Sequence, residues 1–178
     1  MRAGRGRSAR AVAVAGVWHT PGVGMIFEGR RLTSEQVADL AADPSLTAGL
    51  LDREDDVLDL DKAWHGIHFL LTGSAWETSP GAGEAVLGGD PIGDDLGYGP
   101  ARLLPADRVQ LVAAALGEVT ADSLRARFDP AALLAEAIYP QVWDDEDLAS
   151  YLLPNFLSLQ AFYAAAAEET QAVLLVIT

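Results

Sequence analysis

The sequence predicts an α+β fold in which a small sheet, containing the first and last strands of the chain, is covered by several helices. Strand-like runs occupy residues 24–31 and 172–177, near the two ends of the body of the chain. Helical periodicity and capping signals fill most of the sequence between these two runs. The length of 178 residues suffices for one domain with a hydrophobic core and is short for two.

The first part of the body is predicted as a strand, a helix and an irregular acidic segment. The strand covers residues 24–31 and opens at Met25. Thr33 with Gln36 three positions later forms a capping box, which predicts a helix through about residue 42. The segment 46–58 that follows is acidic and shows no regular period, so we expect it to be irregular.

A second helix is predicted between Asp61, which can cap its first turn, and Gly73, which ends it. Its apolar positions follow helical spacing: Trp64, Ile67, Leu70 and Leu71. The next segment, 74–105, is rich in Gly, Pro and Asp and favours turns over regular elements. A segment of this length without secondary structure is usually functional or lies over the core.

The C-terminal part is predicted as a series of helices followed by one strand. Helices are expected at 106–116, from 120 toward 128, at 130–138 and at 148–169. Pro154 should kink the last of them, because proline lacks a backbone donor and clashes with the preceding turn. The aliphatic run 172–177 predicts a strand that is buried on both faces and pairs with the first strand.

The charge of the chain excludes several classes of partner. The formal net charge is −14. The segment before Glu28 contains no acidic residue and four arginines: Arg2, Arg5, Arg7 and Arg10. Without those four, eight basic residues face 26 acidic ones, so the body carries a charge near −18. Such a body repels phosphate groups, which predicts no binding to nucleic acid or to an anionic membrane. A basic protein partner, or a role of the acids in solubility alone, fits the charge better.

The first 24 residues resemble a signal peptide only superficially. A basic start precedes the short apolar run 11–17, but no small-residue cleavage pattern follows. We interpret residues 1–24 as a disordered tail or a misassigned start, and residues 24–178 as a single domain. The absence of cysteine excludes disulfides and thiolate chemistry and fits a reducing compartment. No apolar run reaches about 18 residues, so no membrane-spanning helix is expected, and we predict a cytoplasmic location.

Ionisable side chains are concentrated between residues 58 and 73. His65 and His68 are three positions apart, which places both imidazoles on one side of the predicted helix. A zinc ion would require a third ligand, which Asp59 or Asp61 would have to supply from the preceding turn. We predict no metal and favour histidines that form hydrogen bonds within the structure. Ligand contact or acid–base work remains the alternative.

Two further groups are candidates for binding. In segment 97–102, glycines on both sides of Tyr98 permit sharp turns, and Arg102 could bind a carboxylate or phosphate. We favour an ion pair between Arg102 and one of the many acids. Tyr139, followed closely by Trp143, could line a cavity, although aromatic residues in such a cluster more often belong to the core. No Gly-x-Ser-x-Gly motif supports acyl transfer.

Taken together, these segments resemble the YfbM-like family of bacterial proteins. The resemblance is carried by residues 58–73, 97–102, 139–144 and 159–163, and it covers roughly residues 24–178. Members usually begin near a Met-Ile strand, which corresponds to Met25 and Ile26 here. The resemblance implies an α+β fold and a bacterial origin. The family is a domain of unknown function, so the resemblance implies no activity and no catalytic residues.

Two functional predictions follow from the residues. The first is a non-enzymatic binding or interaction module whose acidic surface docks a basic protein, as a toxin-neutralising immunity protein would. The alternative is an enzyme or small-ligand binder that uses one shared pocket and no cofactor. A third reading is that the motifs specify only the fold. The candidate ligand-binding residues are Asp59, His65, His68, Tyr98, Arg102 and Tyr139.

Overall fold

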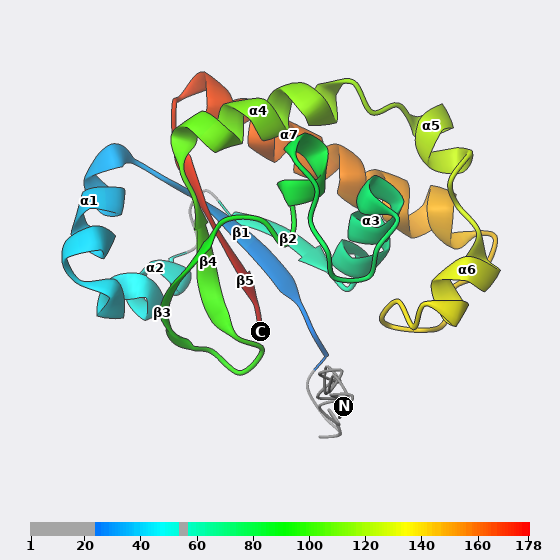
Figure 1. Ribbon diagram of the computed structural model, residues 1–178, viewed down its shortest axis with the longest axis horizontal. Helices are drawn as coiled ribbons and strands as arrows, with labels where there is room; N and C mark the ends of the chain where they lie inside the picture. The colour runs from blue at the N-terminus through cyan, green and yellow to red at the C-terminus, as the bar shows by residue number, and fades with distance from the viewer. Residues whose placement is uncertain (1–23, 54–56) are drawn as a thin grey trace, which may run out of the picture.

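The computed structural model describes residues 24–53 and 57–178, and it is built around one five-stranded antiparallel sheet (Figure 1). The strand order is β2-β1-β5-β4-β3, so the first and last strands are neighbours and the last strand is central. The strands are β1 (Phe27–Leu32), β2 (Val57–Asp61), β3 (Asp90–Asp95), β4 (Pro100–Leu104) and β5 (Ala172–Ile177). The predicted α+β class is confirmed.

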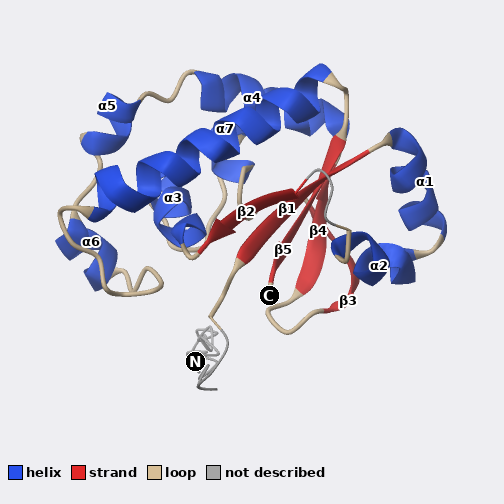
Figure 2. Cartoon of the chain, turned by 180° about the vertical axis from the view of Figure 1, so that it is seen from behind, coloured by secondary structure: helices blue, strands red, loops and turns tan. Residues whose placement is uncertain are grey.

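Helices cover both faces of this sheet unequally. In Figures 1 and 2, α3, α4 and α7 lie over one face, while α1 and α2 lie on the other side. The helices are α1 (Ser34–Ala42), α2 (Thr47–Leu51), α3 (Ala63–Thr72), α4 (Ala106–Gly117), α5 (Ala121–Arg125), α6 (Pro130–Ala135) and α7 (Leu153–Glu168). Shorter turns are η1 (Pro44–Leu46), η2 (Gly81–Glu84) and the π-helical η3 (Leu148–Leu152). No helix in the described ranges is long and apolar enough to cross a membrane.

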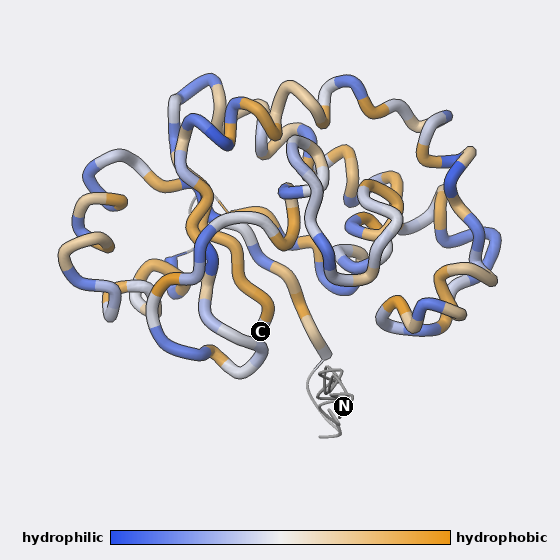
Figure 3. Tube along the Cα trace, in the orientation of Figure 1, coloured by the Kyte–Doolittle hydropathy of each residue, from blue (hydrophilic) through white to orange (hydrophobic). Residues whose placement is uncertain are grey.

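The central position of strand β5, between two hydrophobic cores, explains why its sequence is continuously aliphatic. Its alternate side chains point to opposite faces of the sheet. Val173 and Leu175 belong to the large core under α3, α4 and α7, whereas Leu174 and Val176 belong to the smaller core on the α1–α2 side. The hydropathy colouring of Figure 3 shows apolar segments along the sheet and its covering helices. Burial on both faces and pairing with β1 are therefore confirmed.

Three strands arise where the sequence predicted none. Strand β2 begins in the last two residues of the acidic segment 46–58 that was expected to be irregular and continues to Asp61, with Leu58 and Leu60 buried and the residues between and beside them exposed. Strands β3 and β4 form a hairpin within the segment that was expected to contain only turns. These strands are short and poor in β-branched residues, so their conformation depends more on pairing than on local propensity: β2 pairs with β1, β4 with β5, and β3 with β4.

Two helix starts also differ from the prediction. Asp61 does not cap α3, because its Oδ2 accepts a hydrogen bond from the Tyr151 hydroxyl at 2.7 Å. The same hydroxyl accepts the backbone N–H of Lys62 at 3.0 Å, so Tyr151 supplies the cap from η3. Burial, followed by the bond to Asp61, raises the pKa of Tyr151. The helix predicted at 148–169 begins with the π-helical η3 and continues directly into α7 at Leu153, so Pro154 follows the π-helical turn as the second residue of α7.

Tyr163 of α7 is hydrogen-bonded to the segment 81–87, and the contribution of this bond to stability can be tested directly. Its ring is fully buried, and its hydroxyl donates to the carbonyl of Ala85 at 2.9 Å. Burial raises the pKa of Tyr163. The variant Tyr163→Phe leaves this carbonyl without its donor, so we expect the free energy of unfolding to fall by about 1–2 kcal/mol. Urea denaturation measures the change, and an unaltered free energy would show that the bond contributes nothing.

Candidate functional site

The two histidines of α3 are buried in the interior of the protein. The exposed fraction is 1% for His65 and 0% for His68. Helix α3 packs closely against the η3 region because it carries Gly66. A Cβ atom at this position would lie 2.8 Å from Leu152 Cδ2 and 2.9 Å from Trp143 Cη2. Trp143 is itself buried, so the core interpretation of this aromatic is confirmed.

His65 joins three segments of the chain through both ring nitrogens. The backbone N–H of Tyr139 donates to Nδ1 at 3.0 Å, so the proton resides on Nε2, which donates to the carbonyl of Ala75 at 2.8 Å. The ring stacks on Trp64 with centroids 4.5 Å apart and contacts Trp76 at 4.6 Å. Burial lowers the pKa of His65 to about 4. His65 is therefore a neutral structural link, as the sequence predicted.

His68 is buried without such partners. Neither ring nitrogen has a partner at normal hydrogen-bond geometry in the described part of the chain, although a backbone group of Glu77 lies close enough to act as a weak hydrogen bond. Burial, followed by the proximity of His65, lowers the pKa of His68 to about 4, and the backbone of Glu77 opposes this shift. The predicted hydrogen bonds are well formed for His65, whereas the described residues give His68 only the weak interaction with the Glu77 backbone. Across residues 24–53 and 57–178, no three His, Asp or Glu side chains are grouped as a metal site.

Asp59 and Tyr139 lie in different surroundings from one another. Asp59 is exposed on β2, and its Oδ1 accepts the backbone N–H of Asp61 at 2.6 Å. Tyr139 is half-buried, meets His65 only through its backbone N–H, and has its hydroxyl next to Gly24. Neither side chain lines a cavity described below.

Tyr98 and Arg102 line one cavity of about 340 Å³ beside strands β4 and β5. Trp76 and Thr78 form part of its wall, and residues 175–177 of β5 form another part. The Arg102 guanidinium belongs to its framework, donating from Nε to the carbonyl of Gly88 at 3.0 Å and from Nη2 to that of Gly89 at 2.7 Å. The expected ion pair of Arg102 with an acid is not found among the described residues, so that prediction is wrong.

The turn between β3 and β4 places Tyr98 at the rim of this cavity. Gly97 and Gly99 have φ values of 113° and 102°, which favour glycine, as the expected sharp turn requires. The carboxylate of Asp95 accepts the N–H of Gly97 at 2.7 Å and that of Gly99 at 3.2 Å. Tyr98 remains 38% exposed in this turn, and Trp76 across the cavity is 59% exposed.

The predicted residues do not converge on one pocket. Only Tyr98 and Arg102 share a cavity, whereas Asp59, His65, His68 and Tyr139 lie elsewhere. The prediction of one pocket shared by these residues is therefore wrong. The physical reason is that the side of α3 that carries the histidines faces the interior. The sequence analysis missed Trp76, which contacts His65 and lines the cavity. Its signal is a tryptophan within a polar, turn-rich segment.

Comparisons with known proteins identify relatives but no activity. A family model described as "Domain of unknown function (DUF1877)" matches residues 23–176. The chain is similar to the crystal structure of YfbM from Escherichia coli, a protein of unknown function. The two are 25% identical with a TM-score of 0.68, and the match covers 86% of this chain and 100% of the other. No curated protein matches the chain.

Proposed function

The chain belongs to the DUF1877 family, and from this premise we propose that it is a non-enzymatic binding module that docks a basic protein segment at the cavity between Trp76 and Tyr98. The observation that carries the proposal is the pair of exposed aromatic rings, which come from separate loops and line the same cavity. Tryptophan and tyrosine are enriched at protein interfaces, because they contribute large contact areas with little loss of conformational entropy.

Charge complementarity defines the partner. The chain has a net charge of −14, and exposed acids adjoin the two aromatic residues in sequence. Glu77 follows Trp76, while Asp94 and Asp95 precede the turn that carries Tyr98. A cationic side chain gains from long-range attraction to these acids and from the faces of the aromatic rings. A basic segment with apolar residues therefore fits this site best.

The residues around the cavity favour binding over catalysis. Tyr98 and Arg102 are the ionisable side chains in its lining, and Arg102 is engaged with two backbone carbonyls. Among the described residues, this lining contains no general acid or base that works near neutral pH, since His65 and His68 lie outside it. A second candidate function is small-ligand binding, favoured by the volume of about 340 Å³, which lies within the range of about 300–1,000 Å³ for such sites.

Binding of a defined peptide tests the proposal. The probe is a peptide that alternates arginine and leucine, and its counterpart carries glutamate in place of arginine. We expect the full-length protein to bind the arginine peptide, with an affinity that falls as salt rises, and to reject the counterpart. The variant Trp76→Ala should weaken binding at least about tenfold, as measured by calorimetry.

The matched control is Leu157→Ala, which truncates another exposed apolar side chain away from the cavity. This variant should bind the peptide like the unaltered protein. Equal affinity for both peptides, or unchanged binding by the Trp76→Ala variant, would refute the proposal. If an uncharged small molecule binds in a Trp76-dependent way while the arginine peptide does not, the second candidate function replaces the first.

A further inference from the structure

We propose that a second cavity, between β1 and the helices α1 and α2, binds a small oxyanion, either a carboxylate or a phosphate. The cavity has a volume of about 220 Å³. Three of the eight basic residues in the body line it: Arg30, Arg31 and Arg53. Its other polar lining residues are Thr33, Gln36 and Gln171, so the lining contains no acid within residues 24–53 and 57–178. This inference is independent of the proposed function.

Arg30 organises one wall of the cavity. The side chain is 6% exposed, and its guanidinium donates to the carbonyls of Leu51 and Arg53 and to the carboxylate of Glu28. These bonds hold the C-terminal end of α2 and the following residues against β1. The Nε of Arg30 is nevertheless buried without a hydrogen-bond partner among the described residues. Gln171, another lining residue, has a buried Oε1 in the same situation. Unpaired buried polar atoms are uncommon in folded proteins, so the Arg30 Nε–H, a donor at the cavity, favours an occupant that accepts hydrogen bonds, whereas the Gln171 oxygen is itself an acceptor and does not add to the preference for an anion.

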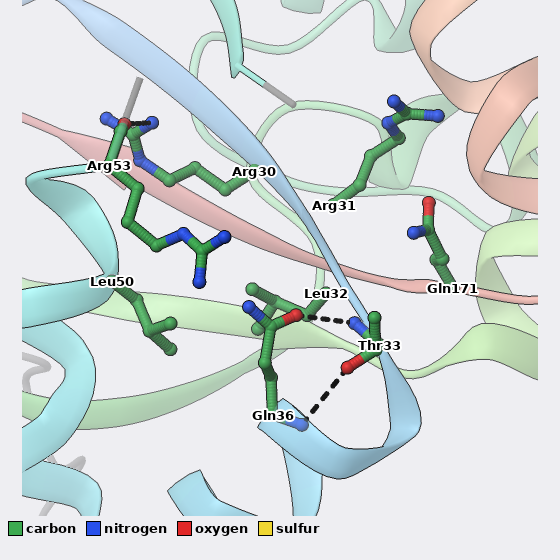
Figure 4. Close-up of a pocket in the computed structure, with 8 residues that line it drawn as sticks. All are labelled: Arg30, Arg31, Leu32, Thr33, Gln36, Leu50, Arg53 and Gln171. Carbon is green, nitrogen blue, oxygen red and sulfur yellow. Dashed lines mark hydrogen bonds between the residues drawn. The ribbon is translucent and has the colours of Figure 1, made fainter. Parts of the chain in front are cut away.

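Arg53 and Gln36 form the part of the cavity that suits an anion. Figure 4 shows the Arg53 guanidinium beside the space bounded by Leu50, Leu32 and the Gln36 side chain, all on one side of β1. Arg31 and Gln171 lie together on the other side of the strand. A guanidinium has five donors in a planar fork that matches two oxygens of a carboxylate or phosphate, so Arg53 can bind an oxyanion while keeping another contact.

The start of α1 adds a second source of positive potential. Thr33 and Gln36 form its capping box, with the Gln36 side chain accepting from Thr33 N–H at 2.8 Å and the Thr33 hydroxyl accepting from Gln36 N–H at 3.3 Å. Both residues line the cavity, so the positive end of the helix dipole faces it. The volume lies below the range of about 300–1,000 Å³ typical of drug-sized ligands, which limits the occupant to a small oxyanion.

Thermal unfolding and calorimetry with two probes test this site. Inorganic phosphate and succinate are titrated into the full-length protein, with sodium chloride at matched ionic strength as the reference. We expect at least one oxyanion to raise the unfolding temperature beyond the chloride reference, because a ligand that binds only the folded state stabilises it. The comparison of the two probes shows whether phosphate or carboxylate is preferred.

Two substitutions that remove the same charge separate specific binding from general screening. Arg53→Gln should weaken oxyanion binding at least about tenfold, because it removes the guanidinium fork. Arg125→Gln is the matched control, since Arg125 is exposed, pairs with Asp122 and lies outside the cavity. This control should retain full binding. An effect of phosphate and succinate no larger than that of chloride, or equal effects of the two substitutions, would overturn the proposal.

Discussion

Replacing His65 with leucine is expected to lower the free energy of unfolding by about 2–5 kcal/mol, because two partly buried backbone groups lose their partners. The N–H of Tyr139 and the carbonyl of Ala75 are bonded only to the two nitrogens of this ring in the described structure. The substitution also removes the stacking on Trp64 and the contact with Trp76. Urea denaturation measures the loss. Binding of the arginine peptide should weaken as well, because His65 supports Trp76.

The matched control for this substitution is His68→Leu. His68 is buried as completely as His65 and lies one helical turn away, but among the described residues its ring nitrogens have no partner at normal hydrogen-bond geometry, only a weak interaction with the Glu77 backbone. Replacing an unsatisfied buried polar ring by an apolar side chain is close to neutral or stabilising, within about 1 kcal/mol. Equal losses in the two variants would show that ring packing, and not the hydrogen bonds of His65, dominates the contribution of these residues.

Acidification is expected to destabilise the protein by about 3–4 kcal/mol between pH 7.5 and pH 5, before most carboxylates titrate. Burial lowers the pKa of both histidines to about 4 from an ordinary value of 6.5. Between these two pKa values, the two imidazoles therefore bind protons in the unfolded chain and remain neutral in the folded chain. Stability is fully present above pH 6.5 and is lost progressively as the pH falls toward 4.

Denaturant titrations at several pH values measure this loss. Since each buried imidazole contributes one proton to the difference, the His68→Leu variant should show about half of the pH dependence between pH 6.5 and pH 5. A free energy of unfolding that stays constant over this interval would mean that the imidazoles are already protonated, or accessible to protons, in the folded protein.

The sequence predicted the elements that carry a strong local signal. The capping box of Thr33 and Gln36 and the aliphatic run of β5 both correspond to the structure. Strands β2 and β3 could not be predicted with the same rules. Val57–Asp61 and Asp90–Asp95 are short and acidic, and their extended conformation is set by pairing with β1 and β4. The alternation of Leu58 and Leu60 with Asp59 and Asp61 was a weak signal for β2.

The candidate site was less predictable than the fold. Tyr98 and Arg102 share a cavity, as their closeness in sequence indicated. The position of His65 depends on which side of α3 faces the core, and most positions of this helix are buried, so its amphipathic pattern is weak. The long-range contact between Trp76 and His65 cannot be inferred from spacing along the chain. The same holds for Arg53, which the fold places near Arg30 through bonds to backbone carbonyls.

The most direct test of the structural role of the histidines is a nitrogen-15 NMR titration of the imidazole rings in the folded protein. Between pH 7.5 and pH 5, we predict that His65 remains neutral with its proton on Nε2, because Nδ1 accepts the N–H of Tyr139 and its pKa is about 4. A protonation midpoint near 6.5, or a proton on Nδ1 in the neutral ring, would contradict a buried structural histidine and return His65 to the candidates for chemistry.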